Sequence, residues 1–208
     1  MKHGDLQLAK QAVEDGADFR IVGENDKSLL RIAAESGKRP ICEWLLTLGA
    51  DVNETRGARK YSLLHNAVAS SNFGMASILL DLGAAPSLKT SNTATPLHIA
   101  ARTGQSYLAE NLIRHRAEIN ASDNNGRTPL HWAVEKDDAS MTKLLISHGA
   151  DVNSTDRKRR TPLAIALAHG QSEIEKLLLQ NGADSKALTK QPWSQRVESQ
   201  NPDPQRIR

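Results

Sequence analysis

The sequence predicts an all-α repeat solenoid in which stacked helix-turn-helix units are joined by β-hairpin fingers. A hexapeptide returns every 33 residues, as TPLHIA from Thr95, TPLHWA from Thr128 and TPLAIA from Thr161. A ladder of Gly-Ala steps accompanies it, with GAD at residues 16, 49, 149 and 182 and GAA at 83. Aromatic residues make up only 3% of the chain, which favours a core of Leu, Ala, Ile and Val between short helices. Self-similarity at a fixed period of this length is the signature of a repeat architecture.

The period extends upstream in weaker form, as SLLHNA from Ser62 and SLLRIA from Ser28. Each Ser or Thr start lies 21 residues before the next Gly-Ala-type step, and RAE at 116–118 takes the place of that step once. The return distance is 12 residues, except for 13 between Gly49 and Ser62. The single extra residue therefore falls in a connecting loop, where an insertion disturbs no packing.

Each unit is predicted to contain two helices. Ser or Thr caps a short first helix, and Pro at its first position loses nothing by lacking an N–H. A glycine break such as RTG at 102–104 ends this helix. The second, longer helix carries apolar residues at helical spacing, for example Leu108, Leu112 and Ile113, and ends in a left-handed cap at the Gly-Ala step. One unit cannot bury both faces of its helices, so neighbouring units must stack.

The order TPLH, glycine break, Leu-Leu step and GADVN recurs over residues 4–184, and in this order the sequence resembles the ankyrin-repeat family. The resemblance implies a non-catalytic solenoid with a concave face of inner helices and projecting β-hairpin fingers, which grips other proteins. Two units depart from the pattern, because SSNFG at 70–74 and KDDAS at 136–140 lack the usual break glycine. In another unit, Asn111 replaces an apolar residue.

We expect one ankyrin-repeat domain over residues 1–184, made of a half-unit at 1–18 and five units that start near 19, 52, 86, 119 and 152. The half-unit has only an outer helix and its Gly-Ala-Asp step, so it is either a natural cap or the edge of a longer array. The period stops after Asp184, and we expect 185–208 to form a basic, flexible C-terminal tail. Within the tail, Trp193 either packs over the last unit or anchors a partner.

The formal net charge of +3 resides in the tail, which holds five Lys and Arg against two acidic residues. Subtracting these from 27 cations and 24 anions leaves 22 of each in residues 1–184, whereas a nucleic-acid binder would carry a basic stripe over its folded domain. No apolar run approaches the ~20 residues that span a bilayer. The N-terminus lacks a signal segment, and the single cysteine excludes a disulfide framework. We expect a monomeric cytoplasmic protein with no membrane insertion.

Three histidines, His65, His98 and His131, recur at one place in successive units, as a metal or catalytic array would. Equivalent positions in a stack lie about one repeat width apart, too far for the ~2.0–2.1 Å bonds of a shared metal. The ankyrin resemblance implies instead that each histidine is structural and bonds neighbouring backbone and hydroxyl groups. Arg31 and Ala164 replace it in the outer units, as expected for a local role.

No residue pattern supports catalysis. Cys42 lies in the predicted outer helix ICEWLLTLG, where a packed thiol is expected rather than a nucleophile. The chain contains no GxGxxG, GxxxxGK[ST], HExxH or GxSxG motif. We therefore predict no enzyme activity, no cofactor and no metal.

The resemblance places the partner-binding surface on the finger residues before each Ser or Thr start and on the last residues of the inner helices. Carried over position by position, this surface comprises Arg59, Tyr61, Ser91, Asn92, Arg102, Asn124, Asn125, Arg127, Glu135, Lys136, Arg157, Lys158, Arg160 and His169. Tyr and Arg are residue types that often dominate binding energy.

The charges on the fingers indicate the kind of partner. Four consecutive cations, residues 157–160, form the tip of the last finger directly before Thr161. Arg56, Arg59 and Lys60 make a second basic tip, and the fingers between the two are nearly neutral. Two separated basic tips suit an acidic segment of a protein better than a continuous phosphate backbone.

We therefore predict a protein-protein interaction scaffold, and two alternatives stay open. The chain could be the ankyrin targeting arm of a larger enzyme or effector, because the first half-unit is incomplete. It could also bind nucleic acid or nucleotides, with the basic tips on phosphates and Trp132 or Tyr61 stacked on bases; affinity would then fall steeply with salt. The run at 157–160 could also serve as a nuclear-import signal.

Overall fold

The computed structural model of the protein describes residues 7, 10, 11, 13–16 and 28–185. The predictions about residues 186–208 and Trp193 concern positions outside this range. The chain divides into two compact parts, an N-terminal part (residues 1–100 and 107–118) and a C-terminal part (residues 101–106 and 119–208). In both parts the described residues form paired helices and connecting loops, so the predicted all-α repeat solenoid is confirmed.

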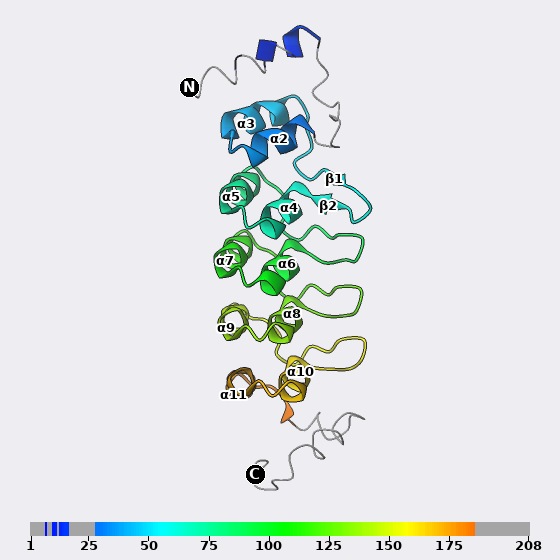
Figure 1. The fold of residues 1–208 in the computed structure, drawn as a ribbon, viewed down its shortest axis with the longest axis vertical. Helices are drawn as coiled ribbons and strands as arrows, with labels where there is room; N and C mark the ends of the chain where they lie inside the picture. Colours follow the sequence, from blue (N-terminus) through cyan, green and yellow to red (C-terminus); the bar gives the residue numbers. More distant parts are fainter. Residues whose placement is uncertain (1–6, 8–9, 12, 17–27, 186–208) are drawn as a thin grey trace. The chain divides into compact units, whose positions relative to one another are not determined.

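The helices follow one another in inner and outer pairs (Figure 1). The N-terminal part contains α2 (Leu29–Glu35), α3 (Arg39–Thr47), β1 (Thr55–Arg56), β2 (Tyr61–Ser62), α4 (Leu63–Ala69), α5 (Phe73–Asp81), most of α6 (Pro96–Thr103) and α7 (Ser106–Arg114). The C-terminal part contains α8 (Pro129–Glu135), α9 (Ala139–Ser147), α10 (Pro162–Ala168) and α11 (Ser172–Gln180).

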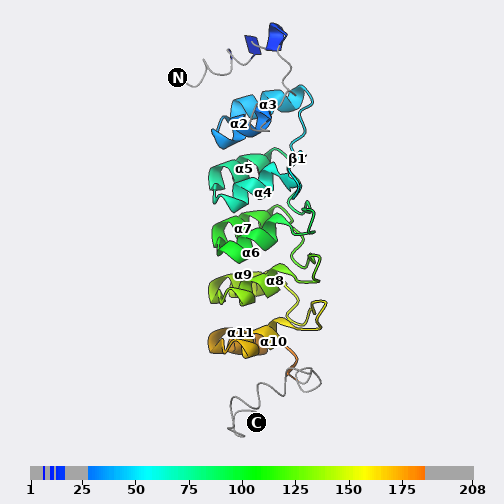
Figure 2. The same cartoon turned by 45° about the vertical axis from the view of Figure 1, so that its right-hand side comes forward.

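Stacking of the pairs is clearest in the C-terminal part. Inner helix α8 packs on outer helix α9, and α10 packs on α11. The two inner helices also contact each other, as do the two outer helices (Figure 2). The loops that precede α8 and α10 project on the side away from the outer helices (Figure 1). Each pair thus buries its second face against its neighbour, as the period requires.

The inner helices begin where the sequence predicts. The hydroxyl oxygens of Ser28, Ser62 and Thr161 each accept the N–H of the residue three positions on, at 3.1, 3.3 and 3.2 Å. Pro129 and Pro162 occupy the first helical position of α8 and α10. Local residues therefore mark the starts of these helices.

The fingers are mostly tight loops rather than paired strands. Strands β1 and β2 form an antiparallel ladder of two residues each in the finger that holds the extra residue. In later fingers, the N–H of Thr90, Asp123 and Asp156 donates to the carbonyl four residues on, at 2.9, 2.9 and 3.0 Å. The predicted hairpin ladder is thus confined, within residues 28–185, to the finger of β1 and β2.

Left-handed residues occur at fixed places in the period. The break glycines Gly37, Gly104 and Gly170 have φ of 65°, 69° and 68°. Where the sequence lacks that glycine, Ser71 and Asp137 adopt φ of 56°. The backbone therefore makes the same turn at these positions. Holding a residue that has a Cβ in this left-handed conformation costs roughly 1–2 kcal/mol of stability.

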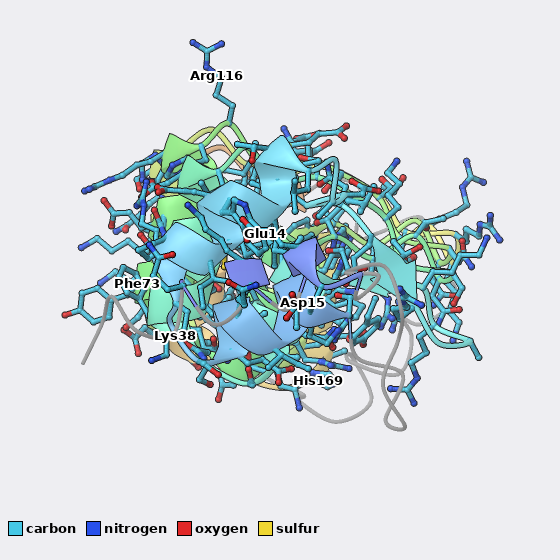
Figure 3. All side chains as sticks on the ribbon, turned by 90° about the horizontal axis from the view of Figure 1, so that it is seen from above. Glu14, Asp15, Lys38, Phe73, Arg116 and His169 are labelled. Carbon is cyan, nitrogen blue, oxygen red and sulfur yellow. The ribbon has the colours of Figure 1, made fainter. Side chains whose placement is uncertain are left out.

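Arg116 takes the place of the glycine that ends the outer helix in the other units, and its φ is 65°. Its side chain is exposed and points outward from the ribbon at the end of α7 (Figure 3). We expect Arg116→Gly to raise the free energy of unfolding by about 1 kcal/mol, because glycine adopts this φ without a steric cost. Urea denaturation measures the change. Arg114→Gly is the control, because glycine inside the last turn of α7 should lower stability by up to about 1 kcal/mol.

The core is aliphatic, as predicted. The largest fully buried side chains are Leu45, Leu63, Leu64, Leu79, Leu97, Ile99 and Leu112 in the N-terminal part and Leu130, Met141, Leu145, Leu163 and Ile165 in the C-terminal part. Cys42 is also fully buried, and burial raises the pKa of its thiol to about 11, so the packed thiol is confirmed. Half-buried Asn111 leaves its Nδ2 without a hydrogen-bond partner among the described residues. None of the described helices is long and apolar enough to cross a membrane.

Two of the recurring histidines, His65 and His131, connect their inner helix to the following finger. Nδ1 of His65 accepts the N–H of Ser62 at 3.2 Å, and Nε2 donates to the carbonyl of Ala94 at 3.3 Å. His131 repeats the arrangement, with Nε2 3.1 Å from the carbonyl of Arg160. Burial lowers the pKa of both rings, that of His65 to about 4. The imidazoles are therefore neutral and structural near pH 7, as predicted.

Candidate protein-binding surface

The finger residues predicted in the N-terminal part lie on two neighbouring fingers. Arg59, Ser91 and Asn92 are exposed, and the N–H of Ser91 donates to the carbonyl of Arg59 at 3.0 Å. Tyr61 is half-buried in β2, and its ring stacks on that of His65 with centroids 5.6 Å apart. Tyr61 thus contributes to packing, whereas the other three side chains face solvent.

Two fingers of the C-terminal part are each built around one buried aspartate. Asp123 and Asp156 accept the backbone N–H groups two and four residues on, at 2.7 to 2.9 Å. Each also accepts Nε of the arginine four residues on, Arg127 at 3.2 Å and Arg160 at 2.8 Å. Burial alone would raise the pKa of both carboxyls, but the backbone N–H donors and the arginine charges outweigh it and lower the pKa. Both aspartates are therefore charged, and they hold the fingers in shape.

Glu135, at the end of α8, ties these two fingers to the inner helix. Its Oε2 lies 2.8 Å from Nη1 of Arg127, and its Oε1 lies 3.8 Å from Nη2 of Arg160. We call Asp123, Arg127, Glu135, Asp156 and Arg160 the finger network. Three residues of the predicted surface therefore bind one another and act chiefly as scaffold.

The exposed tip of the last finger consists of Arg157, Lys158 and Arg159. Arg160 turns back to Asp156, so the run of four cations does not act as one unit. Arg159 was missing from the predicted surface, although it is exposed and has a φ of 60° at the turn of the loop. The Asp-to-Arg spacing of four residues, present at 123–127 and 156–160, could have separated the scaffold arginine from the tip.

The two fingers contact each other directly. The N–H of Arg157 donates to the carbonyl of Asn125 at 2.8 Å. Beside this bond, a Cβ added to Gly126 would lie 3.0 Å from the nitrogen of Arg157. The exposed side chains of Asn124 and Asn125 therefore stand at a fixed spacing from the basic tip.

The end of the inner-helix face in the C-terminal part is centred on Trp132 of α8. The indole Nε1 donates to Oδ2 of Asp123 at 3.0 Å. The guanidinium carbons of Arg102 and Arg127 lie 5.3 and 5.1 Å from the centre of the indole ring, within cation–π range. Lys136 and His169, at the C-caps of α8 and α10, are exposed. Trp132 was absent from the predicted set, although TPLHWA carries the only aromatic residue at this position of the repeated hexapeptides.

The buried charged and imidazole side chains of this surface make structural contacts. Within the described ranges, no group of three or more His, Cys, Asp or Glu could hold a metal ion. The buried aspartates are committed to backbone donors and arginines, and the buried histidines to backbone groups. The exposed side chains of the two fingers in the C-terminal part include the cations Arg157, Lys158 and Arg159 and the amides Asn124 and Asn125.

Comparison with known proteins agrees with the repeat architecture. A family model described as ankyrin repeats in three copies matches residues 1–90, 30–123, 64–156 and 97–189. The transient receptor potential cation channel subfamily A member 1 homolog of Caenorhabditis elegans is 29% identical over 124 residues, 58% of this chain and 10% of the channel. The E3 ubiquitin-protein ligase Ufd4 of Drosophila melanogaster is 33% identical over 94 residues, 45% of this chain and 3% of the ligase. The chain thus spans a tenth or less of each of these two relatives. With the 33-residue period and the capped helix pairs, the family match establishes that the chain belongs to the ankyrin-repeat family.

Proposed function

We propose that the chain is a non-catalytic protein-interaction module whose finger tips in the C-terminal part bind an acidic segment of a partner protein. Ankyrin repeats are protein-interaction modules. The observation that carries the finer proposal is the tip at 157–159, where three cations are exposed on a loop whose aspartate faces inward. Cations on a loop that is already ordered lose little entropy on binding and steer an acidic partner to the surface. We place this interaction in the cytoplasm.

The test compares capture of proteins from a nuclease-treated lysate by the wild-type chain and by a tip variant. The tip variant carries Arg157→Ser, Lys158→Ser and Arg159→Gly, and it keeps Arg160 because that residue holds the finger. A matched control removes three exposed cations from outer helices through Arg114→Ser, Lys143→Ser and Lys176→Ser. We expect a partner that the wild type and the control retain and the tip variant loses.

Equal capture by the tip variant would contradict the proposed role of the finger tip. Recovery of the partner only before nuclease treatment, together with a steep loss of binding as salt rises, would instead assign the tip to nucleic acid. The two outcomes differ because an acidic protein segment survives nuclease treatment.

A second proposal is that the chain works as the ankyrin arm of a larger protein. The observation that favours it is the small share of the relatives covered, 10% of the channel homolog and 3% of the ligase. Sequencing the native transcript upstream of Met1 tests it. An open reading frame that continues upstream would support the larger protein, and an in-frame stop would exclude an N-terminal extension.

A further inference from the structure

We propose that Arg102, stacked on Trp132, is the anchor for a carboxylate side chain of the partner's acidic segment. The inference rests on the proposed function and adds to it a specific contact on the inner-helix face, away from the finger tip. The partner is thereby expected to engage the C-terminal part at two places, the tip at 157–159 and the end of α6.

Arg102 is an exposed arginine in the last turn of α6. Its guanidinium carbon lies 5.3 Å from the centre of the Trp132 ring. Among the described residues, the guanidinium of Arg102 has no hydrogen-bond or ion-pair partner. A guanidinium held over an aromatic ring by a cation–π contact still has N–H donors to offer a ligand. Stacking also orients the side chain in advance, which reduces the entropy lost on binding.

The indole beneath Arg102 is itself held in place. Its Nε1 donates to Asp123 at 3.0 Å, and the Arg127 guanidinium lies 5.1 Å from the ring centre. Asp123 is in turn fixed by the backbone of its finger. The indole of Trp132 is therefore held in place, and its N–H resonance can report binding at Arg102.

The fold does not require an arginine at this position. The equivalent residues one or two periods away are Ala69, Glu135 and Ala168, so Arg102 departs from the repeat. Its neighbours on the inner-helix ends include exposed Lys136 and His169. An arginine that the repeat does not demand and that no described residue pairs is available for recognition.

The charge and shape of the Arg102 guanidinium suit a carboxylate. The finger network contains two arginines and three carboxylates, so it carries one excess negative charge. Arg102 adds one positive charge that no described residue neutralises. A carboxylate carries one charge and can accept two parallel N–H bonds from a guanidinium.

The test uses the indole N–H resonances of the ¹⁵N-labelled full chain. The chain has three tryptophans, and Trp132→Phe assigns the resonance of interest. The probes are a tetraglutamate peptide and a tetraglutamine peptide of equal length. We expect tetraglutamate to shift the Trp132 resonance saturably and tetraglutamine to leave it unchanged. Arg102→Gln should weaken binding about tenfold or more, because it removes a charge-assisted pair of hydrogen bonds. Arg102→Lys should weaken it less, because the charge remains.

Arg114→Gln is the matched control, because it removes an exposed arginine from outer helix α7. It should leave the affinity for tetraglutamate unchanged. The inference is overturned if Arg102→Gln binds tetraglutamate as tightly as the wild type, or if millimolar tetraglutamate leaves the Trp132 resonance unshifted. Tighter binding of a tetraphosphoserine peptide or of a short oligothymidylate would also overturn it and assign the site to phosphate.

Capture from lysate separates this inference from the proposed function. If the tip variant loses the partner and Arg102→Gln retains it fully, the proposed function stands and the anchor is rejected. If tetraglutamate binds through Arg102 while the tip variant and the wild type capture the same proteins, the anchor stands and the role of the tip is rejected.

Discussion

Asp123→Ala is expected to lower the free energy of unfolding by about 3 kcal/mol. The Asp123 side chain is buried and accepts hydrogen bonds from the backbone of Asn125 and Arg127, from the Arg127 guanidinium and from the Trp132 indole. Its removal leaves several donors without a partner in a half-buried setting, and each such loss costs roughly 1–3 kcal/mol before relaxation and hydration recover part of it.

Urea denaturation followed by Trp fluorescence measures the effect. The control is Asp151→Ala, because exposed Asp151 accepts one backbone N–H, that of Asn153 at 2.9 Å. We expect the control to cost less than about 1 kcal/mol. Equal losses in the two variants would show that the finger network adds no stability beyond an ordinary loop bond.

The second large effect is a loss of stability as the pH falls from about 6.5 to about 4. Burial lowers the pKa of His65 to about 4 in the folded chain, from an ordinary value near 6.5 in the unfolded chain. Between these values the unfolded chain binds a proton that the folded chain does not, so stability decreases as the pH decreases. The shift corresponds to roughly 3 kcal/mol for this one ring. His131 acts in the same direction, because burial also lowers its pKa.

Urea denaturation at several pH values checks this dependence. His65→Gln should flatten the pH profile between pH 4 and 6.5, whatever its effect on stability at pH 7. His148→Gln is the control for the loss of an exposed histidine. A wild-type chain as stable at pH 4.5 as at pH 7 would contradict the structural role of the buried histidines. Below pH 4 a separate loss is expected, since Asp123 and Asp156 have lowered pKa values and must then be protonated.

The fold was predictable because its determinants are local. Ser62 and Thr161 cap helices through bonds to residues three positions on, and such caps are visible in the sequence as Ser or Thr before Leu or Pro. The departures are equally local. Ser71 and Arg116 adopt the left-handed conformation of the glycines that they replace, because the chain must reverse direction at the same place in every period.

The candidate surface was only partly predictable, because exposure depends on pairing that the period does not encode. Arg157 and Arg160 are the same residue type in one run of cations. Arg160 is nevertheless held by Asp156, whereas Arg157 faces solvent. The stacking of Arg102 on Trp132 joins two different repeats, so neither residue alone indicates it. The sequence likewise does not reveal the surroundings of Arg31. This arginine is buried, and its Nε and Nη2 have no hydrogen-bond partner among the described residues.

Site-specific photo-crosslinking tests most directly whether the finger tips of the C-terminal part touch a protein partner. The photoreactive residue p-benzoylphenylalanine would replace Lys158 or Asn124 on the fingers, and Lys143 or Lys176 on the outer helices as controls. The proposed function predicts that Lys158 and Asn124 crosslink to one common protein and that the two outer-helix positions do not. Crosslinking of that protein from the outer helices, with none from the fingers, would contradict it.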